Sequence, residues 1–160
     1  MSSLIPLLLE TADPRPEKLG KILGREKGEI EHELEELRKN KTLLGWMPIL
    51  NPEKTDVGKV RAVIEVKISP EREGGFDRMA LRISKFEEVE SCYLMSGGYD
   101  LLVFVSGKTL NSVALFISER LATIEGVLST STHFLLRPYK ERHHLLAQDG
   151  ASEGKPPVSP

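Results

Sequence analysis

Apolar residues recur at helical spacing through the first 40 residues of the chain, in three separate runs. The first run, in residues 4–11, predicts a short helix that the Asp-Pro-Arg-Pro sequence at 13–16 ends. The second predicts a helix that begins at Pro16 and ends at Gly24. The third predicts a longer helix within residues 24–40, with one narrow apolar stripe formed by Ile30, Leu34 and Leu37. Three helices joined by short turns indicate a helix-turn-helix domain.

The segment that follows has a different character. "TLLGWMPILNPEKTD", residues 42–56, contains two short β-prone runs on either side of Gly45. These runs predict a small wing after the third helix, followed by a linker strand.

From Val60 onward, segments in which apolar residues recur every two residues, as in strands, alternate with segments in which they recur about every 3.6 residues, as in helices. Alternation in residues 60–68 predicts a strand with one strongly apolar face. Further strands are expected at 89–95, 101–107 and 127–137, and helices at 76–86 and 110–121. The order β-α-β-β-α-β is that of a ferredoxin-like domain.

The predicted fold class is therefore α+β, a winged helix-turn-helix followed by a βαββαβ ferredoxin-like domain. We assign residues 1–57 to the first domain with its linker strand, 58–146 to the second, and 147–160 to a disordered tail. Both helices of the second domain must cover one face of its sheet. The strand "LLVFV" is apolar on both faces, which predicts an obligate dimer that covers the other face.

Composition narrows the possible partners. The chain has 160 residues, is 39% hydrophobic and 29% charged, and carries a net charge of −2. Residues 1–57 hold 9 basic and 11 acidic residues, so any nucleic-acid contact must rest on a local patch. No apolar run is long enough to span a membrane, and the single cysteine, Cys92, favours the reducing cytoplasm.

Four segments carry a resemblance to a known family. They are "LLLETADPRPEKLGKILG", "LLGWMPILNPEK", "VESCYLMSGGYDLLVFVSG" with its Gly-x-Tyr-Asp turn, and "VLSTSTHFLLRPYK". Over residues 4–142 the chain resembles the Lrp/AsnC transcription regulators, the leucine-responsive and asparagine regulator family. The resemblance implies a homodimer, which in that family often stacks into tetramers or octamers. It also implies binding to pseudo-palindromic double-stranded DNA and to an amino acid between effector domains, with no cofactor.

The resemblance places the effector pocket at the hairpin turn and on the last strand. Its residues are Gly97, Gly98, Tyr99, Asp100, Thr130 and Thr132. Glycine allows backbone N–H groups to approach a ligand carboxylate, and an aspartate can pair with an α-ammonium group. The same glycines and aspartate also fit a tight hairpin that Asp100 caps, so the residues alone leave both interpretations open.

The third helix would be the recognition helix, although it is rich in glutamate. At 100° per residue from Ile30, the direction opposite the docking stripe holds Gly28, Lys39 and His32, at about 160°, 180° and 200°. Related regulators usually carry arginines where this chain has Glu31, His32 and Glu33. Glutamate accepts hydrogen bonds from cytosine amino groups in some interfaces, and basic residues at the helix ends bind phosphates. The candidate DNA-binding residues are Lys21, Arg25, Lys27, Gly28, His32, Glu35, Lys39 and Lys41.

Two alternatives remain open. One is an amino-acid sensor that has lost DNA binding, an interpretation that the glutamate-rich helix favours. The other is an enzyme like the siroheme decarboxylases, which have the same architecture, but the chain shows no corresponding His and Arg cluster. We expect no catalytic residues, and no metal site, because His143 and His144 have no partner ligand at metal-binding spacing.

Overall fold

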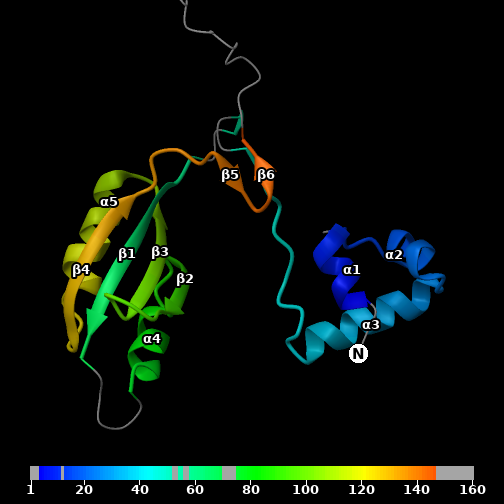
Figure 1. The fold of residues 1–160 in the computed structure, drawn as a ribbon, viewed down its shortest axis with the longest axis horizontal. Coiled ribbons are helices and arrows are strands. Elements are labelled where there is room, and N and C mark those ends of the chain that lie inside the picture. Colours follow the sequence, from blue (N-terminus) through cyan, green and yellow to red (C-terminus); the bar gives the residue numbers. More distant parts are fainter. Residues whose placement is uncertain (1–3, 12, 52–53, 56–57, 70–74, 147–160) are drawn as a thin grey trace, which may run out of the picture. The chain divides into compact units, whose positions relative to one another are not determined.

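The computed structural model describes residues 4–11, 13–51, 54–55, 58–69 and 75–146. The chain divides into two units, residues 1–49 and 50–160, and each has its own hydrophobic core (Figure 1). The predicted domain boundary at 57/58 stays a prediction, since residues 56 and 57 are not among those described. The predicted tail, 147–160, also lies outside the described residues.

The first unit consists of the three predicted helices, α1 (Leu4–Thr11), α2 (Pro16–Leu23) and α3 (Lys27–Lys39) (Figure 1). The predicted stripe of α3 is its buried face. It packs with α1 and α2 in one core, whose buried members are Leu4, Leu7, Leu19, Ile30, Leu34 and Leu37. The burial of this stripe decides which side of α3 faces outward.

The turn between α2 and α3 depends on two glycines. Gly24 ends α2 in the left-handed conformation, with φ 64° and ψ 33°. The chain then folds back, so that the Arg25 N–H donates to the Gly20 carbonyl oxygen at 2.9 Å. A Cβ on Gly20 would lie 2.6 Å from the Arg25 carbonyl oxygen. Residue 20 must therefore lack a side chain for α3 to begin so close to α2.

The predicted wing does not form. Residues 43–51 contain no helix or strand, and several of their large apolar side chains are exposed: Leu44, Trp46, Met47, Ile49 and Leu50. A two-stranded hairpin is marginal in water unless other elements cover it, and Pro48 has no N–H to donate. High β-propensity was therefore not enough to form a strand in this segment, and the predicted linker strand is also absent from it.

The second unit is built on a four-stranded antiparallel sheet of order β2-β3-β1-β4 (Figure 1). The strands are β1 (Val60–Ile68), β2 (Val89–Leu94), β3 (Leu101–Gly107) and β4 (Val127–Phe134). This confirms the predicted ferredoxin-like order. β1 is central and pairs with both β3 and β4.

Helices α4 (Asp77–Ile83) and α5 (Leu110–Leu115) cover one face of this sheet. α5 continues into a π-helical segment, η2 (Phe116–Leu121), where the sequence pattern predicted a single α-helix. The core between helices and sheet holds the alternate residues of β1 and β3: Ala62, Ile64, Val66, Ile68, Leu101, Val103 and Val105. One set of alternating side chains on each strand thus faces the helices.

The other face of the sheet carries apolar side chains with no helix over them. In the strand register Tyr93 lies opposite Leu102, and Phe104 lies opposite Val63. Tyr93 and Phe104 form an edge-to-face pair with ring centroids 6.1 Å apart. Tyr93 is 50% exposed in the single chain. We call this surface, formed by Val63, Tyr93, Leu102 and Phe104, the open face.

A short hairpin follows β4, and the sequence analysis missed it. Its strands are β5 (Lys140–Glu141) and β6 (His144–Leu145), joined by Arg142 and His143 at φ 45° and 73°. Two left-handed residues are the geometry of a type I′ turn, which usually selects Asn-Gly or Asp-Gly. Because Arg-His is not such a signal, no turn is predicted there from the residue types.

Candidate nucleic-acid interface and effector site

The outward side of α3 holds the residues that its geometry predicted. Gly28, His32 and Lys39 are all exposed, on the side away from the buried stripe. A Cβ built on Gly28 would meet nothing within 4 Å, so the backbone there is open to a close approach. This line of residues has the position of a recognition surface.

Each cation at the ends of this surface is already paired with two carboxylates. The Lys27 ammonium lies 2.7 Å from Glu17 and 3.6 Å from Glu31. The Lys39 ammonium lies 3.3 Å from Glu36 and 3.5 Å from Glu35. The hydrogen bond that Lys27 donates to Glu17 raises the pKa of Lys27, and the one that Lys39 donates to Glu36 raises the pKa of Lys39. Both lysines are thus charged and partly neutralised by their neighbours.

Arg25 is held more tightly than the lysines. Its guanidinium lies 2.5 Å from Glu33 and 3.3 Å from Glu29, and its side chain is only 31% exposed. The Glu33 contact is the main cause that raises the pKa of Arg25. Arg25 therefore ties the turn to the side of α3, while Lys27 and Lys39 remain more than half exposed.

The other predicted DNA contacts lie at the periphery of the first unit. Lys21 lines a shallow hollow of about 240 Å³ at α2, together with Arg15, Glu17 and Lys18. Lys41 follows α3 at a positive φ of 60° and is exposed. Glu35 is exposed beside the outward line, in its contact with Lys39.

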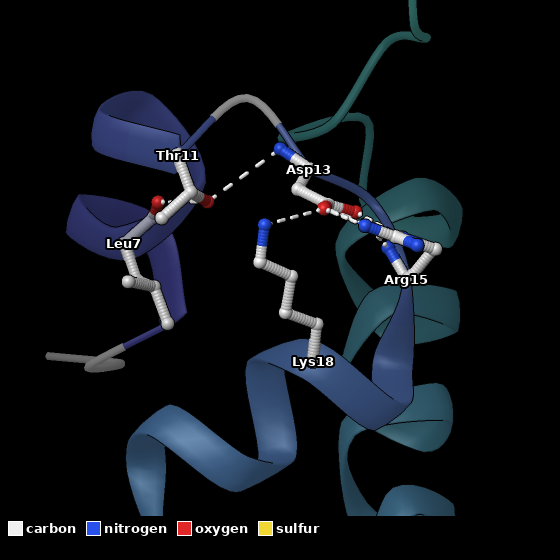
Figure 2. Close-up of polar contacts among 5 residues, drawn as sticks. All are labelled: Leu7, Thr11, Asp13, Arg15 and Lys18. Carbon is white, nitrogen blue, oxygen red and sulfur yellow. Dashed lines mark hydrogen bonds and ion pairs between the residues drawn. The ribbon is translucent and has the colours of Figure 1, made fainter.

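A carboxylate network fixes the start of α2 (Figure 2). The Asp13 carboxylate accepts from the Arg15 backbone N–H at 3.1 Å and from the Arg15 guanidinium at 2.6 Å. The Lys18 ammonium donates to the same carboxylate at 2.9 Å, and the Thr11 hydroxyl donates to the Leu7 carbonyl at 2.8 Å. Arg15, followed by Lys18, holds the pKa of Asp13 well below its usual range. The ionised Asp13 thus orients the chain between α1 and α2.

In the second unit, the predicted effector turn is anchored to β1. Gly97 has φ 144°, a region that favours glycine, and both Gly97 and Gly98 are exposed. The Asp100 N–H donates to the Val66 carbonyl at 3.0 Å, and the Asp100 carboxylate accepts from the Ile68 N–H at 2.8 Å. Asp100 therefore acts structurally across 32 positions of sequence.

The two threonines lie on β4, on the other side of β1 from the turn. Thr130 is opposite Val66 in the register, and Thr132 is opposite Ile64. Since Val66 also pairs with Leu101, Thr130 and the turn lie at the same end of the sheet, about 10 Å apart across one intervening strand. Both threonines are half-buried at the sheet edge, and Thr132 is two register positions further from the turn.

Comparison with known proteins identifies this architecture. Residues 61–145 match the model of the Lrp/AsnC ligand-binding domain. The chain is 39% identical over 140 residues to the HTH-type transcriptional regulator YugG of Bacillus subtilis, which covers 87% of this chain and 84% of YugG. The chain belongs to the Lrp/AsnC family of transcription regulators. A proline dehydrogenase transcriptional activator of Rhizobium radiobacter is 29% identical over 124 residues, or 78% of this chain and 79% of the activator.

Solved structures of Lrp/AsnC proteins have the same fold. Escherichia coli AsnC aligns with a TM-score of 0.61 at 18% identity, over 86% of this chain and 91% of AsnC. A transcriptional regulator of Neisseria meningitidis in complex with L-Met aligns with a TM-score of 0.61 at 23% identity, over 84% of this chain and 86% of the regulator. At these identities the likeness concerns the fold alone. No helix in the described part of this Lrp/AsnC chain is long and apolar enough to cross a membrane.

Three features of this Lrp/AsnC protein were not found by sequence reasoning. Glu17 on α2 contacts Lys27 across the turn, Asp13 organises the start of α2, and the Asp100 carboxylate binds the end of β1. The Asp-x-Arg spacing was a signal for the second feature, because aspartate commonly accepts from the backbone two residues on. The Glu17–Lys27 and Asp100–Ile68 contacts join different secondary-structure elements, and no local sequence pattern indicates that these elements lie close together.

Proposed function

We propose that this protein is a sequence-specific DNA-binding regulator that acts in the cytoplasm as a homodimer and responds to an amino acid. The observation that carries the proposal is the docking of α3. Its stripe is buried, and Gly28, His32 and Lys39 form an exposed line opposite it. A helix held in this way can enter the major groove of DNA with that line toward the bases.

A second candidate function is that of an amino-acid sensor without DNA binding. The ion pairs on α3 favour it, because Lys27 and Lys39 each contact two carboxylates that a DNA phosphate would have to displace. These pairs lie on exposed side chains, where ion pairs are weak and exchange readily with other partners. We therefore favour the DNA-binding function.

The two candidates differ in the effect of reversing these charges. If Lys27 and Lys39 contact phosphates, the double variant Lys27→Glu, Lys39→Glu loses two contacts on each chain. The slope of log affinity against log salt then falls by about 2 for each DNA-bound chain, and affinity falls in low salt. The measurement is fluorescence anisotropy with a duplex enriched from a random-sequence pool by the wild-type protein.

The matched control is Lys59→Glu, Lys108→Glu, which changes the charge equally at exposed residues of the second unit. We expect the control to keep most of the wild-type affinity. An equal loss in both double variants would show that only total charge matters, and the absence of any enriched duplex would leave the sensor as the better account.

We place the effector at the end of the sheet that carries the turn 97–100 and Thr130. Support comes from the ligand-binding domain model and from the fold shared with the L-Met complex. The glycine N–H groups there suit a ligand carboxylate, and the Asp100 carboxylate suits an α-ammonium group. The Asp100 carboxylate also accepts from the Ile68 N–H. A ligand ammonium group that pairs with this carboxylate would therefore affect the hydrogen bond at the end of β1.

The effector proposal is tested by Asp100→Asn with a thermal-shift screen of the twenty amino acids. Asparagine keeps a carbonyl oxygen for the Ile68 N–H but removes the negative charge that would pair with the ammonium group. A ligand at 100 times its Kd stabilises the wild type by about 2.7 kcal/mol. We expect this stabilisation to be lost in Asp100→Asn and kept in the control Glu119→Gln. An undiminished shift in Asp100→Asn would remove the proposed site.

The homodimer is proposed to form through the open face. Its apolar members, Val63, Tyr93, Leu102 and Phe104, have no helix over them among the described residues of the second unit, and burial of apolar area contributes roughly 25 cal/mol per Å². We expect Phe104→Glu to reduce the mass measured by light scattering from that of an oligomer to that of one chain. The control Leu110→Glu, at an exposed helical position, should keep the wild-type mass. An oligomer that survives Phe104→Glu would contradict this interface.

A further inference from the structure

Three of the five glutamates of α3 lie beside the exposed lysines at the two ends of the outward line. Glu31 contacts Lys27, and Glu35 and Glu36 contact Lys39, so that carboxylates accompany the cations at both ends of the helix. The side chains of these three glutamates are between 52% and 63% exposed. Their charges therefore lie at the surface that DNA would approach.

Glu29 and Glu33 have a different place. Both bind Arg25, whose side chain is 31% exposed; the Glu33 side chain is 22% exposed and the Glu29 side chain is 59% exposed. They tie the turn between α2 and α3 to the helix. Glu31, Glu35 and Glu36 instead contact Lys27 and Lys39.

Carboxylates in this position oppose the part of DNA binding that does not depend on sequence. Lysine and arginine contacts to phosphates supply nearly all non-specific affinity. Here each phosphate must replace the carboxylates of a paired lysine, and those carboxylates then remain close to a polyanion. The resulting cost is the same for every DNA sequence.

Contacts to base edges do not carry the same cost. In the major groove the cytosine amino group is a donor that glutamate accepts, and adenine also presents an amino group. Glu31 and Glu35 flank the outward line at about 100° and 140° from Ile30, on the same side of it. A glutamate carboxylate beside the outward line is tolerated or favoured only at base pairs whose amino groups it can accept hydrogen bonds from.

We propose that Glu31, Glu35 and Glu36 are specificity determinants that suppress binding to DNA of unrelated sequence while sparing the preferred site. This inference rests on the proposed DNA-binding function. Specificity is the difference between the affinities for the preferred and for unrelated DNA sequences. An acidic recognition helix would increase this difference by weakening the binding to unrelated sequences.

The test is the triple variant Glu31→Gln, Glu35→Gln, Glu36→Gln, which keeps side-chain shape, removes three charges and replaces one acceptor oxygen of each carboxylate by an amide donor. Its matched control is Glu87→Gln, Glu119→Gln, Glu125→Gln, at exposed positions of the second unit. Circular dichroism first establishes that both variants keep the wild-type helix content. Affinity is then measured by anisotropy between about 50 and 200 mM salt, for the random duplex pool and for a duplex that the wild type enriches from it.

We expect the triple variant to bind the random pool roughly ten-fold more tightly than the wild type, with a steeper salt dependence. Affinity for the enriched duplex should rise by much less, so that the ratio of the two affinities falls. The control should change both affinities equally and slightly.

Two results would overturn the inference while DNA binding stands. One is a triple variant that binds the random pool no more tightly than the control does. The other is an equal gain on both DNAs, which leaves specificity unchanged. If neither the wild type nor the triple variant binds any duplex, the proposed DNA-binding function fails, and the inference fails with it.

Discussion

The docking of α3 on α1 and α2 is the constraint on which the surface proposed to face DNA depends. A helix turns by 100° per residue, so fixing one face fixes the direction of every other side chain. Ile30, Leu34 and Leu37 are buried, and the absence of a side chain at Gly20 lets α3 start within hydrogen-bonding distance of α2. Gly28, His32 and Lys39 consequently face outward, and Glu31, Glu35 and Glu36 lie beside them.

Within this frame the charges of α3 serve more than one purpose. Arg25 with Glu29 and Glu33 is part of the turn, because its side chain is mostly buried against the helix. Lys27 and Lys39 are exposed and hold their carboxylates by weak surface pairs that phosphates can replace. A net negative charge on α3 is therefore compatible with DNA binding, provided that affinity depends on contacts to bases more than on contacts to phosphates.

The sequence predicted the elements whose pattern is local. The stripe on α3, the alternation along β1 and the glycines at 24 and 97 each reflect a periodicity or a turn requirement within a few residues. The outward direction of Gly28, His32 and Lys39 followed from the same periodicity and is confirmed by their exposure.

Other features depend on contacts that a local pattern does not specify. The bond between the Asp100 carboxylate and the Ile68 N–H spans two strands, and the Glu17–Lys27 contact crosses a turn. The predicted wing was wrong because residues 43–51 have β-propensity but pair with no strand in the described part of the chain. The β5–β6 hairpin was missed because its turn uses Arg142 and His143, which are unusual at positive φ.

At the end of the sheet where the effector is proposed to bind, one residue has two roles. Asp100 is both the best candidate for recognising an ammonium group and the residue that joins the turn to β1, and β1 also pairs with the strand that carries Thr130. A ligand that draws on the Asp100 carboxylate would compete with the Ile68 N–H. This provides a direct physical route from ligand binding to the centre of the sheet.

The central claim is that the outward line of α3 contacts DNA. Amide chemical-shift mapping of the full-length protein, titrated with a duplex that it enriches from a random pool, tests this most directly. The account predicts that the largest changes occur at the amides around Gly28, His32 and Lys39, while those of the open face and of the turn 97–100 change little. A bound duplex that leaves the α3 amides unchanged would contradict it.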